Sequence, residues 1–469
     1  MSFTPTQRSY KALSILTALT ALGMILSPSG ILDMLFLGTL IIVLAHTFIG
    51  ERLLLIFLAL RPTVDMWRDS SVGSILGANI NINALLALMI TVWGVYMLWR
   101  FKAYIHLVPY RWHLFGLTML MVLSSIYSKA PGETLVETLK FFNLVTLFII
   151  GFVFIKTKTI RMRDILTAIA VSAVVPITLG IVQLLFGTGI TTFDVRGRIH
   201  GTFAHPNVFA FFLLSLIILL IHNAYIRPSA FWRGRSRTLA HISFAALSLL
   251  MVFTYTRITV IGFLILMLTF GLLQFKKALI WSLLSIAILL VLSLPLNNIL
   301  HSYANTDLRE LPVIHRLTTR SEDADSISWR LEVFNGSVPL IRTHPLFGWG
   351  YATFETLWGN NRGLDHLFDD SAEAHNDYLR IAVELGIVGL FIYLLFLARL
   401  LWRMAEPTLF GSDAERKKYL HLFAWVLAFG VMSISDNMIH HTPVMWLTFT
   451  YWGAALAERT KPWEKGFLQ

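Results

Sequence analysis

Apolar runs of helical length recur along the chain, separated by short polar breakers. An α-helix needs about 20 apolar residues to cross the hydrocarbon core of a bilayer, and lipid offers the backbone no hydrogen-bond partners. Such runs therefore predict transmembrane helices rather than strands. The predicted spans lie near 11–27, 31–49, 51–62, 82–99, 111–127, 134–156, 163–186, 207–223, 239–255, 258–275, 277–297, 376–403, 417–435 and 441–457. We expect an all-α polytopic transmembrane bundle with about 12–14 spans.

Two of the early runs need separate treatment. The first run, Lys11 to Ser27, has no small-residue cleavage site leading into a soluble domain, and further apolar runs follow at once. This pattern favours a retained helix over a signal peptide. The third run, 51–62, is too short to cross a bilayer unaided. It is kept in the count because dropping it would place basic connections on both sides of the membrane.

The distribution of Lys and Arg predicts the orientation. With the N-terminus inside, most of the 38 basic residues fall in one set of connections. The opposite short connections hold Arg61, Arg68, Lys129, Arg196, Arg198 and Arg257. Short cytoplasmic loops are enriched in basic residues, so we expect both termini to be cytoplasmic. The net charge of +11 is then a topology signal, and we expect no nucleic-acid partner.

One long hydrophilic segment interrupts the bundle. Residues 298–374 carry more acids than bases, together with aromatic residues such as Trp349 and Trp358. A segment of this length and composition is expected to fold into a cap with short helices. The predicted organisation is an N-terminal membrane bundle at 1–297, a large extracytoplasmic loop at 298–374, and C-terminal spans with a cytoplasmic tail at 375–469.

Composition excludes several classes of protein and site. Hydrophobic residues make up 56% of the chain and charged residues 14%, whereas an average soluble domain has roughly 25% charged residues. The chain has no cysteine, which excludes disulfides, thiolate metal sites and cysteine nucleophiles. No phosphate-binding or dinucleotide glycine motif accompanies a strand–helix unit, so nucleotide use is not expected.

Polar residues near the bilayer are costly and therefore indicate function. The first such cluster runs from Arg196 to Asn207 and includes Arg198, His205 and Pro206. Pro206 suits a first helical turn, and a helix N-terminus flanked by arginines is a ready anion site. The alternative is a capped interfacial loop whose arginines meet lipid head groups.

Two further arginines stand on the same predicted side. Arg257 follows Thr254-Tyr255-Thr256 and interrupts an otherwise apolar stretch, although a single arginine at a helix hairpin can simply reach the interface. Arg330 follows Trp329 at the start of an amphipathic stretch in the loop, where a surface position on a cap helix is the alternative.

The fourth cluster is Glu373 to Tyr378, where the loop re-enters the membrane. His375 could take a proton from an acceptor that approaches from outside, or could cap the helix that follows. A metal site is another alternative, because oxygen and imidazole groups gather here without strict ligand spacing. The residues concerned are Asp365, His366, Asp369, Asp370, Glu373, His375 and Asp377. His440-His441 could line the same cavity or pack at the interface.

At these residues the chain resembles the superfamily of O-antigen ligases and O-antigen polymerases, which are bacterial envelope glycosyltransferases. The motifs lie in order on one predicted side, over roughly residues 196–392. They are Gly197-Arg198, Gly201-Thr-Phe203, His205-Pro-Asn207, Tyr255-Thr-Arg257, Arg330, His344-Pro-Leu-Phe-Gly348-Trp-Gly350, His375-Asn-Asp-Tyr378 and Glu384-Leu-Gly386-Ile-Val-Gly389.

The resemblance implies a glycan donor linked to undecaprenyl diphosphate at the outer leaflet of the bacterial inner membrane. It also implies inverting transfer that needs neither a metal ion nor another cofactor. Carried onto this sequence, Arg198, Arg257 and Arg330, with His205 and Asn207, would bind the diphosphate. His375 would be the base on the acceptor hydroxyl.

Three functions remain open at this level. A ligase would transfer a finished polysaccharide to lipid A-core, and a polymerase would use a second lipid-linked repeat unit as acceptor. The excess of acids in the loop favours a polymerase, because the lipid A-core is anionic, whereas the His-Asn-Asp-Tyr element looks closest to ligases. A flippase or transporter of lipid-linked glycan is the alternative from another class, although no repeat with interrupted spans is present.

Overall fold

A computed structural model describes residues 30–68, 70–75, 78–192, 195–229, 232, 237–277, 280, 326–361 and 373–459. Helices make up most of these residues, and the expected all-α polytopic membrane fold is confirmed. The structure adds two short antiparallel hairpins that the sequence analysis did not predict. They pair β1 (Ser71–Ile75) with β2 (Ala78–Asn81) and β3 (Ile190–Thr192) with β4 (Val195–Arg198).

The first half of the described chain contains eight helices of α type. They are α2 (Gly30–Ile49), α3 (Leu53–Val64), α4 (Ile82–Arg100), α5 (Lys102–Ile105), α6 (Arg111–Ser124), α7 (Pro131–Lys156), α8 (Met162–Ser172) and α9 (Val174–Phe186). Short 3-10 turns flank α3 as η1 (Gly50–Arg52) and η2 (Asp65–Trp67).

The second half contains the remaining helices. They are α10 (Pro206–Leu220), the π-helical turn η3 (Ile221–Ile226), α11 (Arg237–Phe253), α12 (Arg257–Leu273), α15 (Ser326–Thr343), α16 (Phe354–Asn361), α17 (Asp377–Leu409), α18 (Asp413–Met432), the 3-10 turn η5 (Met438–His440) and α19 (Thr442–Ala457).

Six helical stretches in the described chain are long and apolar enough to cross a membrane. They are Gly38–Trp67, Ile82–Arg100, Pro131–Lys156, Met162–Phe186, Pro206–Ile226 and Asp377–Leu409. Two shorter apolar helices, α11 and α12, fall on predicted spans as well. The predicted spans at 11–27 and most of 277–297 lie outside the described residues, so the count of fourteen stays a prediction.

Two predicted spans differ in detail from the structure. The short run at 51–62 forms α3, which continues from α2 through η1 as one helical stretch. The run at 163–186 is divided at Ala173 into α8 and α9. Pro176 lies just after this division and has no backbone N–H to continue the helical hydrogen bonds, which explains why the helix is interrupted here.

The centre of the bundle is the pair α7 and α19. Both helices are buried over most of their length, and two glycines bring their backbones together. A Cβ atom at Gly151 would lie 2.4 Å from the carbonyl oxygen of Thr450, and one at Gly453 would lie against the carbonyl of Phe148. Small residues at a helix crossing allow this close approach, which is a common way to pack helices in membranes.

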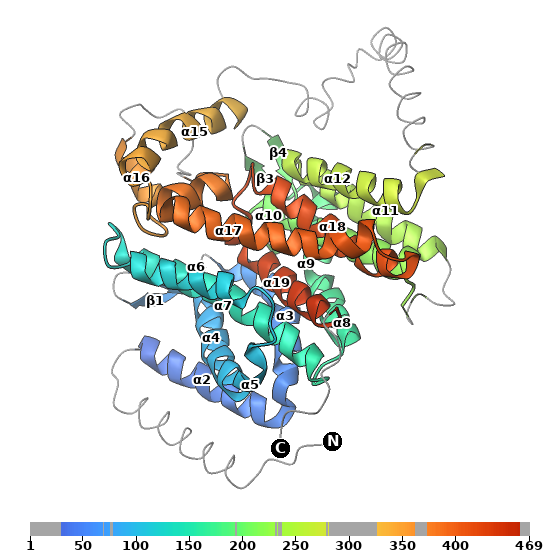
Figure 1. Ribbon diagram of the computed structural model, residues 1–469, viewed down its shortest axis with the longest axis horizontal. Coiled ribbons are helices and arrows are strands. Elements are labelled where there is room, and N and C mark those ends of the chain that lie inside the picture. Colours follow the sequence, from blue (N-terminus) through green and yellow to red (C-terminus); the bar gives the residue numbers. More distant parts are fainter. Residues whose placement is uncertain are drawn as a thin grey trace.

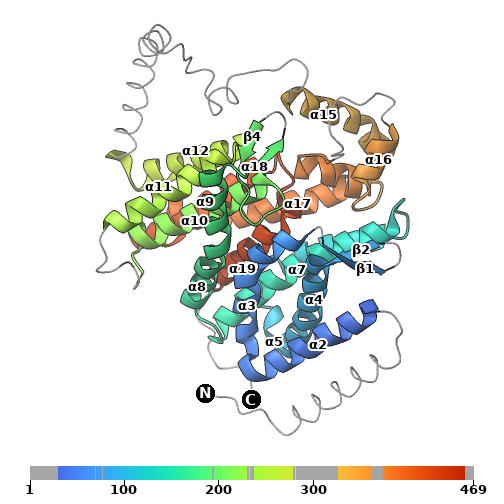
Figure 2. The same ribbon diagram turned by 180° about the vertical axis from the view of Figure 1, so that it is seen from behind.

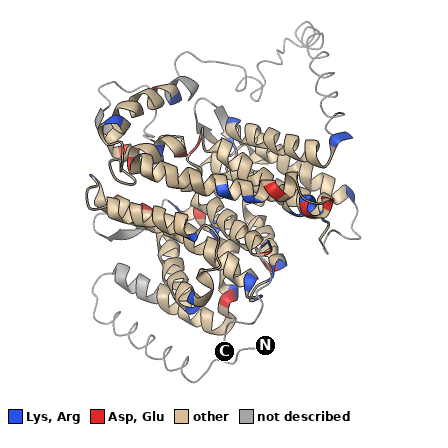
Figure 3. Cartoon of the chain, in the orientation of Figure 1, with Lys and Arg blue, Asp and Glu red and all other residues tan. Residues whose placement is uncertain are grey.

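The helices form two groups. In Figures 1 and 2, α10, α11 and α12 occupy the upper part, α2 to α5 lie below, and α17 and α7 cross the region between them. Lys, Arg, Asp and Glu are sparse over the ribbon, as expected for helices in lipid (Figure 3). The site described below lies where ends of helices from both groups meet.

Helices α15 and α16 belong to the predicted loop at 298–374 and pack beside α17 (Figure 1). Buried apolar residues join them to the start of α17 in a small second core. These residues are Val333, Leu340, Phe354, Leu357, Trp358, Leu379 and Val383. The described part of the loop is thus packed as a cap, while the division of the chain into three domains remains a prediction.

Candidate active site

A cavity of about 800 Å³ lies at one end of the bundle. It is lined from the C-terminal ends of α3 and α18 and the N-terminal ends of α4, α7, α10, α12, α17 and α19. The sequence analysis singled out six site residues, and all six line this cavity: Arg198, His205, Asn207, Arg257, Arg330 and His375. They come from four separate segments of the chain, which the fold brings to one place.

The β3–β4 hairpin supplies Arg198 at its last position. The side chain is 1% exposed, and its orientation is fixed from two sides. Its Nε donates a hydrogen bond to the carbonyl oxygen of Thr254 at 2.9 Å, and its Nη2 donates to Oδ1 of Asn207 at 3.2 Å. Arg198 thereby links the hairpin, the turn before α12 and the first turn of α10.

The start of α10 contributes His205 and Asn207. His205 is the N-cap residue, and its Nδ1 accepts a hydrogen bond from the backbone N–H of Asn207 at 3.1 Å. Burial, with the positive charge of Arg198 adding to it, lowers the pKa of His205 to about 4. The imidazole is therefore neutral near pH 7, as an acceptor of this backbone hydrogen bond must be.

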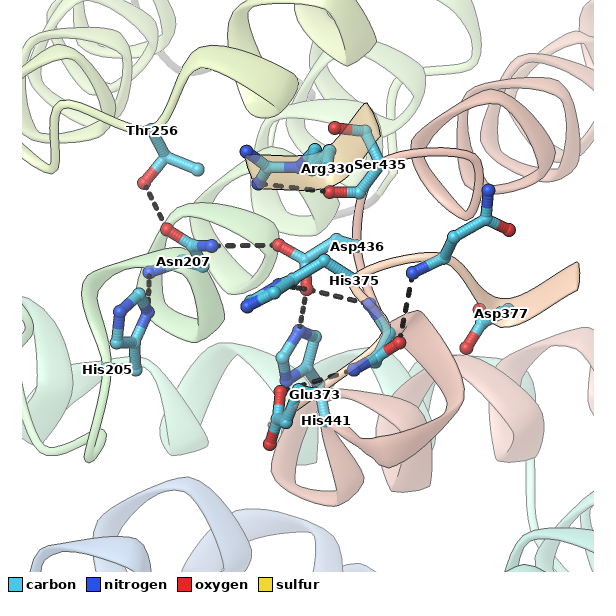
Figure 4. A network of polar contacts seen from close by, with 12 residues as sticks. His205, Asn207, Thr256, Arg330, Glu373, His375, Asp377, Ser435, Asp436 and His441 are labelled. Carbon is cyan, nitrogen blue, oxygen red and sulfur yellow. Dashed lines mark hydrogen bonds and ion pairs between the residues drawn. The ribbon is translucent and has the colours of Figure 1, made fainter. Parts of the chain in front are cut away.

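Asn207 connects the arginine side of the cavity to the side that holds His375. Its Oδ1 accepts hydrogen bonds from Arg198 and from Oγ1 of Thr256 at 3.2 Å, and its Nδ2 donates to Oδ2 of Asp436 at 2.8 Å (Figure 4). The amide uses both its acceptor and its donor capacity, which fixes its orientation.

Arg257 is the first residue of α12. The preceding turn is held by Thr254, and Tyr255 adopts a left-handed backbone conformation with φ of 52°. The buried Nε of Arg257 has no hydrogen-bond partner among the described residues, although the side chain lines the cavity. A buried donor that faces a cavity is costly unless a ligand or water satisfies it. Arg257 is thus available to an anion.

Arg330 reaches the cavity from the cap. It lies in α15, and its Nη2 donates to the carbonyl oxygen of Ser435 at 3.4 Å (Figure 4). Ser435 follows α18, so this contact joins the predicted loop to the membrane bundle. The cap therefore contributes a third guanidinium to the same side as Arg198 and Arg257.

His375 lies just before α17 in a strained backbone conformation with φ of 44°. Its Nδ1 is 3.9 Å from Oδ1 of Asp436, a carboxylate that is 1% exposed. Nε2 of His441 lies 2.9 Å from the same oxygen. Burial would raise the pKa of Asp436, but His441 and His375 outweigh it and hold that pKa well below its usual range. Asp436 is therefore ionised and can orient His375.

The segment around His375 is tied to the turn after α18. The backbone N–H of Asn376 donates to Oδ1 of Asn437 at 3.1 Å, and Nδ2 of Asn437 donates to Glu373 at 3.2 Å. The side chain of Asn376 also caps α17 by accepting from the N–H of Leu379 at 3.0 Å. These contacts stabilise the strained conformation of His375, and such strain is common at functional sites.

Helix α17 is broken within the membrane bundle at Gly386, where φ is 65° and ψ is −168°. The segment after α15 repairs the break. The N–H groups of Trp349 and Gly350 donate to the carbonyls of Val383 and Glu384 at 3.0 and 2.9 Å, and the N–H of Ile387 donates to the carbonyl of Pro345 at 2.8 Å. The short helical piece that begins beside His375 is thereby joined to the cap.

Several residues of the cavity were not singled out from the sequence. The most important is Asp436, and others are Arg61, Asp65, Glu137, Lys140, Glu355 and Arg380. The polar stretch Ser433 to Asn437 at the end of an apolar helix was an available signal for Asp436. His440 and His441, which the sequence places either at the cavity or in interfacial packing, both line the cavity.

The alternative of a metal site is not tested by the structure. Among the described residues, no group of three or more His, Asp or Glu side chains is arranged to hold a metal ion. Four of the residues named for that hypothesis, Asp365, His366, Asp369 and Asp370, lie outside the described part of the chain.

Comparison with known proteins gives one family. Residues 242–394 of the 469-residue chain match the model of the O-Antigen ligase family. The matched region contains Arg257, Arg330 and His375, whereas Arg198, Asn207 and Asp436 lie outside it. None of the curated proteins compared with the chain matches it. The family match over residues 242–394 and the polytopic helical fold both support the superfamily of O-antigen ligases and polymerases for this chain.

Proposed function

We propose that this protein transfers a glycan from undecaprenyl diphosphate to an acceptor hydroxyl at the outer face of the bacterial inner membrane. One observation carries the proposal: Arg198, Arg257 and Arg330 line the same cavity as His375. Three guanidinium groups suit a diphosphate leaving group, and an imidazole suits the proton of an attacking hydroxyl.

The arginines would stabilise the transition state. Negative charge grows on the diphosphate as the bond between the anomeric carbon and the phosphate oxygen breaks. Positive groups already held in place stabilise that charge without reorganisation, which is the largest catalytic term in many enzymes. The fixed orientation of Arg198 and the unsatisfied Nε of Arg257 support this role.

His375 would act as the general base. It removes the proton of the acceptor hydroxyl while that oxygen attacks the anomeric carbon, and undecaprenyl diphosphate leaves from the opposite face. A single displacement of this kind inverts the anomeric configuration. The ionised Asp436 beside His375 would stabilise the imidazolium that forms. The reaction as written needs no metal ion and no nucleotide.

The acceptor separates the two closest alternatives. Purified protein in proteoliposomes is given lipid-linked glycan with lipid A-core or with a second lipid-linked unit as acceptor. Product on the core alone means that the protein is a ligase, which is the function we favour from the motifs. A ladder of products on the lipid means a polymerase, and movement of lipid-linked glycan without a new glycosidic bond means a transporter.

We predict that Arg257→Ala and His375→Ala insert into the membrane normally and lose transfer activity. Loss of a general base costs about 10²- to 10⁴-fold in rate, and loss of one charge-stabilising donor costs about 10²- to 10³-fold. Transfer is measured with purified protein, with Lys417→Ala at the opposite end of α18 as the control. Wild-type activity in either cavity variant would contradict the assigned role.

The metal hypothesis has its own experiment. If transfer requires no metal ion, a strong chelator leaves the rate unchanged. Loss of activity with chelator and recovery with a divalent cation would instead make the re-entry segment before α17 a metal site, and the mechanism given above would then be wrong.

A further inference from the structure

The cavity has charged groups of one sign on one side and of both signs on the other. The side formed by β4, the start of α10, α12 and α15 contains Arg198, Arg257 and Arg330. No lining residue from these elements is an acid, among those that the structure describes. A side with this composition attracts anions, in agreement with a diphosphate.

The other side, which we call the mixed-charge wall, consists of Glu137, Lys140, Glu355, Arg380 and His440. These residues come from α7, α16, α17 and η5 and pair with one another. Lys140 forms an ion pair with Glu137, and Nδ1 of His440 lies 3.5 Å from the same carboxylate. Nη1 of Arg380 lies 3.7 Å from Oε1 of Glu355. Two acids offset two bases, and the neighbouring carboxylate of Glu373 adds a third acid, so this wall has no net attraction for an anion.

We propose that the mixed-charge wall is the subsite for the acceptor glycan, and that it binds uncharged sugar hydroxyls. The inference rests on the proposed function. A sugar hydroxyl donates one hydrogen bond and accepts others, and alternating carboxylates and cationic N–H groups satisfy both capacities. A second anionic group would gain nothing from a wall whose acids offset or outnumber its bases.

The exposure of the wall residues shows which of them an acceptor can reach. The side chains of Glu355 and Lys140 are 52% and 40% exposed, whereas that of Arg380 is 5% exposed and is held by Glu384 at 3.0 Å. Glu355 and Lys140 would therefore contact the sugar, and Arg380 would orient Glu355. Among the small-molecule sites of proteins, a cavity of about 800 Å³ is large enough for such a ligand.

The wall is also placed correctly relative to the base. His440 belongs to the turn that carries Asp436 and His441, and Glu373 lies two residues before His375 in contact with Asn437. Burial would raise the pKa of Glu373, but the neighbouring His375, Arg380, His441 and His440 together outweigh it and lower that pKa. An acceptor on the mixed-charge wall would thus present a hydroxyl to His375 from the side opposite the arginines.

Steady-state kinetics of the purified full-length protein test the subsite. Glu355→Ala should raise the KM for an uncharged oligosaccharide acceptor by about tenfold, while the KM for the lipid-linked donor changes by less than about threefold. Glu137→Gln, a conservative change in the same wall, is a second variant for the same comparison of acceptor and donor KM values. Asp413→Asn, on the exposed start of α18, is the matched control. An unchanged acceptor KM, or an equal rise in both KM values, would overturn the proposal, since a purely structural ion pair would not separate the two substrates.

The chemical class of the acceptor is tested with two sugars that differ in one phosphate group. We expect the two acceptor KM values to agree within about threefold. If the KM for the phosphorylated sugar is lower by about tenfold or more, and Lys140→Gln removes this difference, the wall binds an anion and the proposal is wrong. If the wild type forms no glycosidic bond at all, the proposed function fails. Calorimetric binding of the uncharged oligosaccharide to wild type and Glu355→Ala still decides the subsite, because weaker binding to the variant supports it and equal binding refutes it.

Discussion

Asp436 is the residue on which the two halves of the candidate site converge. Its carboxylate lies 3.9 Å from His375, 2.9 Å from His441 and 2.8 Å from Asn207. Asn207 in turn contacts Arg198, so one buried carboxylate connects the group proposed as base to the groups proposed to bind diphosphate. A displacement of Asp436 would therefore affect both functions at once.

We predict that Asp436→Asn lowers kcat by about 10²- to 10⁴-fold, because the amide cannot stabilise an imidazolium and favours the wrong tautomer of His375. The acidic limb of the kcat–pH profile should also move. Asp436 is a positioning residue, so donor and acceptor KM values should change little. Asp413→Asn is the control. An unaltered pH profile together with a modest fall in kcat would indicate that Asp436 acts through stability alone.

Acid should destabilise the protein through His205. The pKa of this group is lowered to about 4 in the folded protein, below the ordinary value of 6.5. The unfolded chain therefore binds the proton more readily, and stability is full above about pH 6.5 and is lost as the pH falls toward 4. The contribution is about 3 kcal/mol. Thermal unfolding in detergent between these pH values should show a smaller loss of stability for His205→Asn than for the wild type. An equal loss in the two proteins would show that His205 is not its cause.

At the residue scale, the sequence identifies charged and titratable side chains whose position next to apolar runs is energetically costly. Arg198, Arg257 and His375 stood out because charged or titratable residues interrupt apolar runs or border them. Asp436 and Glu137 did not stand out, because each is one acid at the end of a span and gains its meaning from contacts with segments far away in the sequence. Asn207 was proposed as a diphosphate ligand, and its observed bond to Asp436 adds a connecting role that spacing alone could not indicate.

At the scale of elements, the break in α17 is the feature that positions the base. The piece from Asp377 to Leu385 begins two residues after His375 and is joined to the cap through backbone hydrogen bonds around Gly348. A Cβ atom at Gly348 would lie 2.4 Å from the carbonyl carbon of Glu384, and one at Gly386 would lie against Leu346. Both glycines also have positive φ, so another residue would be strained at either position.

We predict that Gly386→Ala destabilises the protein by about 1–3 kcal/mol or more and lowers transfer at least tenfold. A Cβ atom at this position would push α17 away from the backbone of Leu346 in the cap. Gly116→Ala in α6 is the matched control, since a Cβ atom there meets nothing within 4 Å. That change should be neutral or stabilising, as alanine is the better helix former. Thermal unfolding and transfer assays measure both, and equal effects of the two substitutions would contradict the role of the break.

The helices were largely predictable because apolar length determines them, but their interruptions were not. The break at Gly386 lies inside an apolar run and leaves the hydropathy pattern unchanged, and the π-helical turn at Ile221–Ile226 extends α10 past the end of its predicted run. The β3–β4 hairpin was missed for a related reason. Its strands are three and four residues long, which is too short for an alternating pattern to be recognised.

At the scale of the whole molecule, the cavity and the charge pattern agree. Every helix end that lines the cavity is an end that the distribution of Lys and Arg places on the outer side, and this includes the end of α3 that holds Arg61 and Asp65. The short span at 51–62 was counted on the charge pattern. The separate count of this run still rests on the charge pattern alone, and the orientation of the chain in the membrane is likewise a prediction.

Cysteine labelling can test the orientation directly, because the chain has no cysteine of its own. Lys129 lies in the exposed turn between α6 and α7, on the cavity side, and Asp413 lies at the opposite end of α18. If the cavity faces outward, a membrane-impermeant thiol reagent should label Lys129→Cys in intact spheroplasts and should not label Asp413→Cys. Both should react after detergent treatment, and the cysteine-free wild type gives the background. Labelling of Asp413→Cys alone would place the cavity, and the arginines within it, on the cytoplasmic side, where a donor held at the outer leaflet could not reach them.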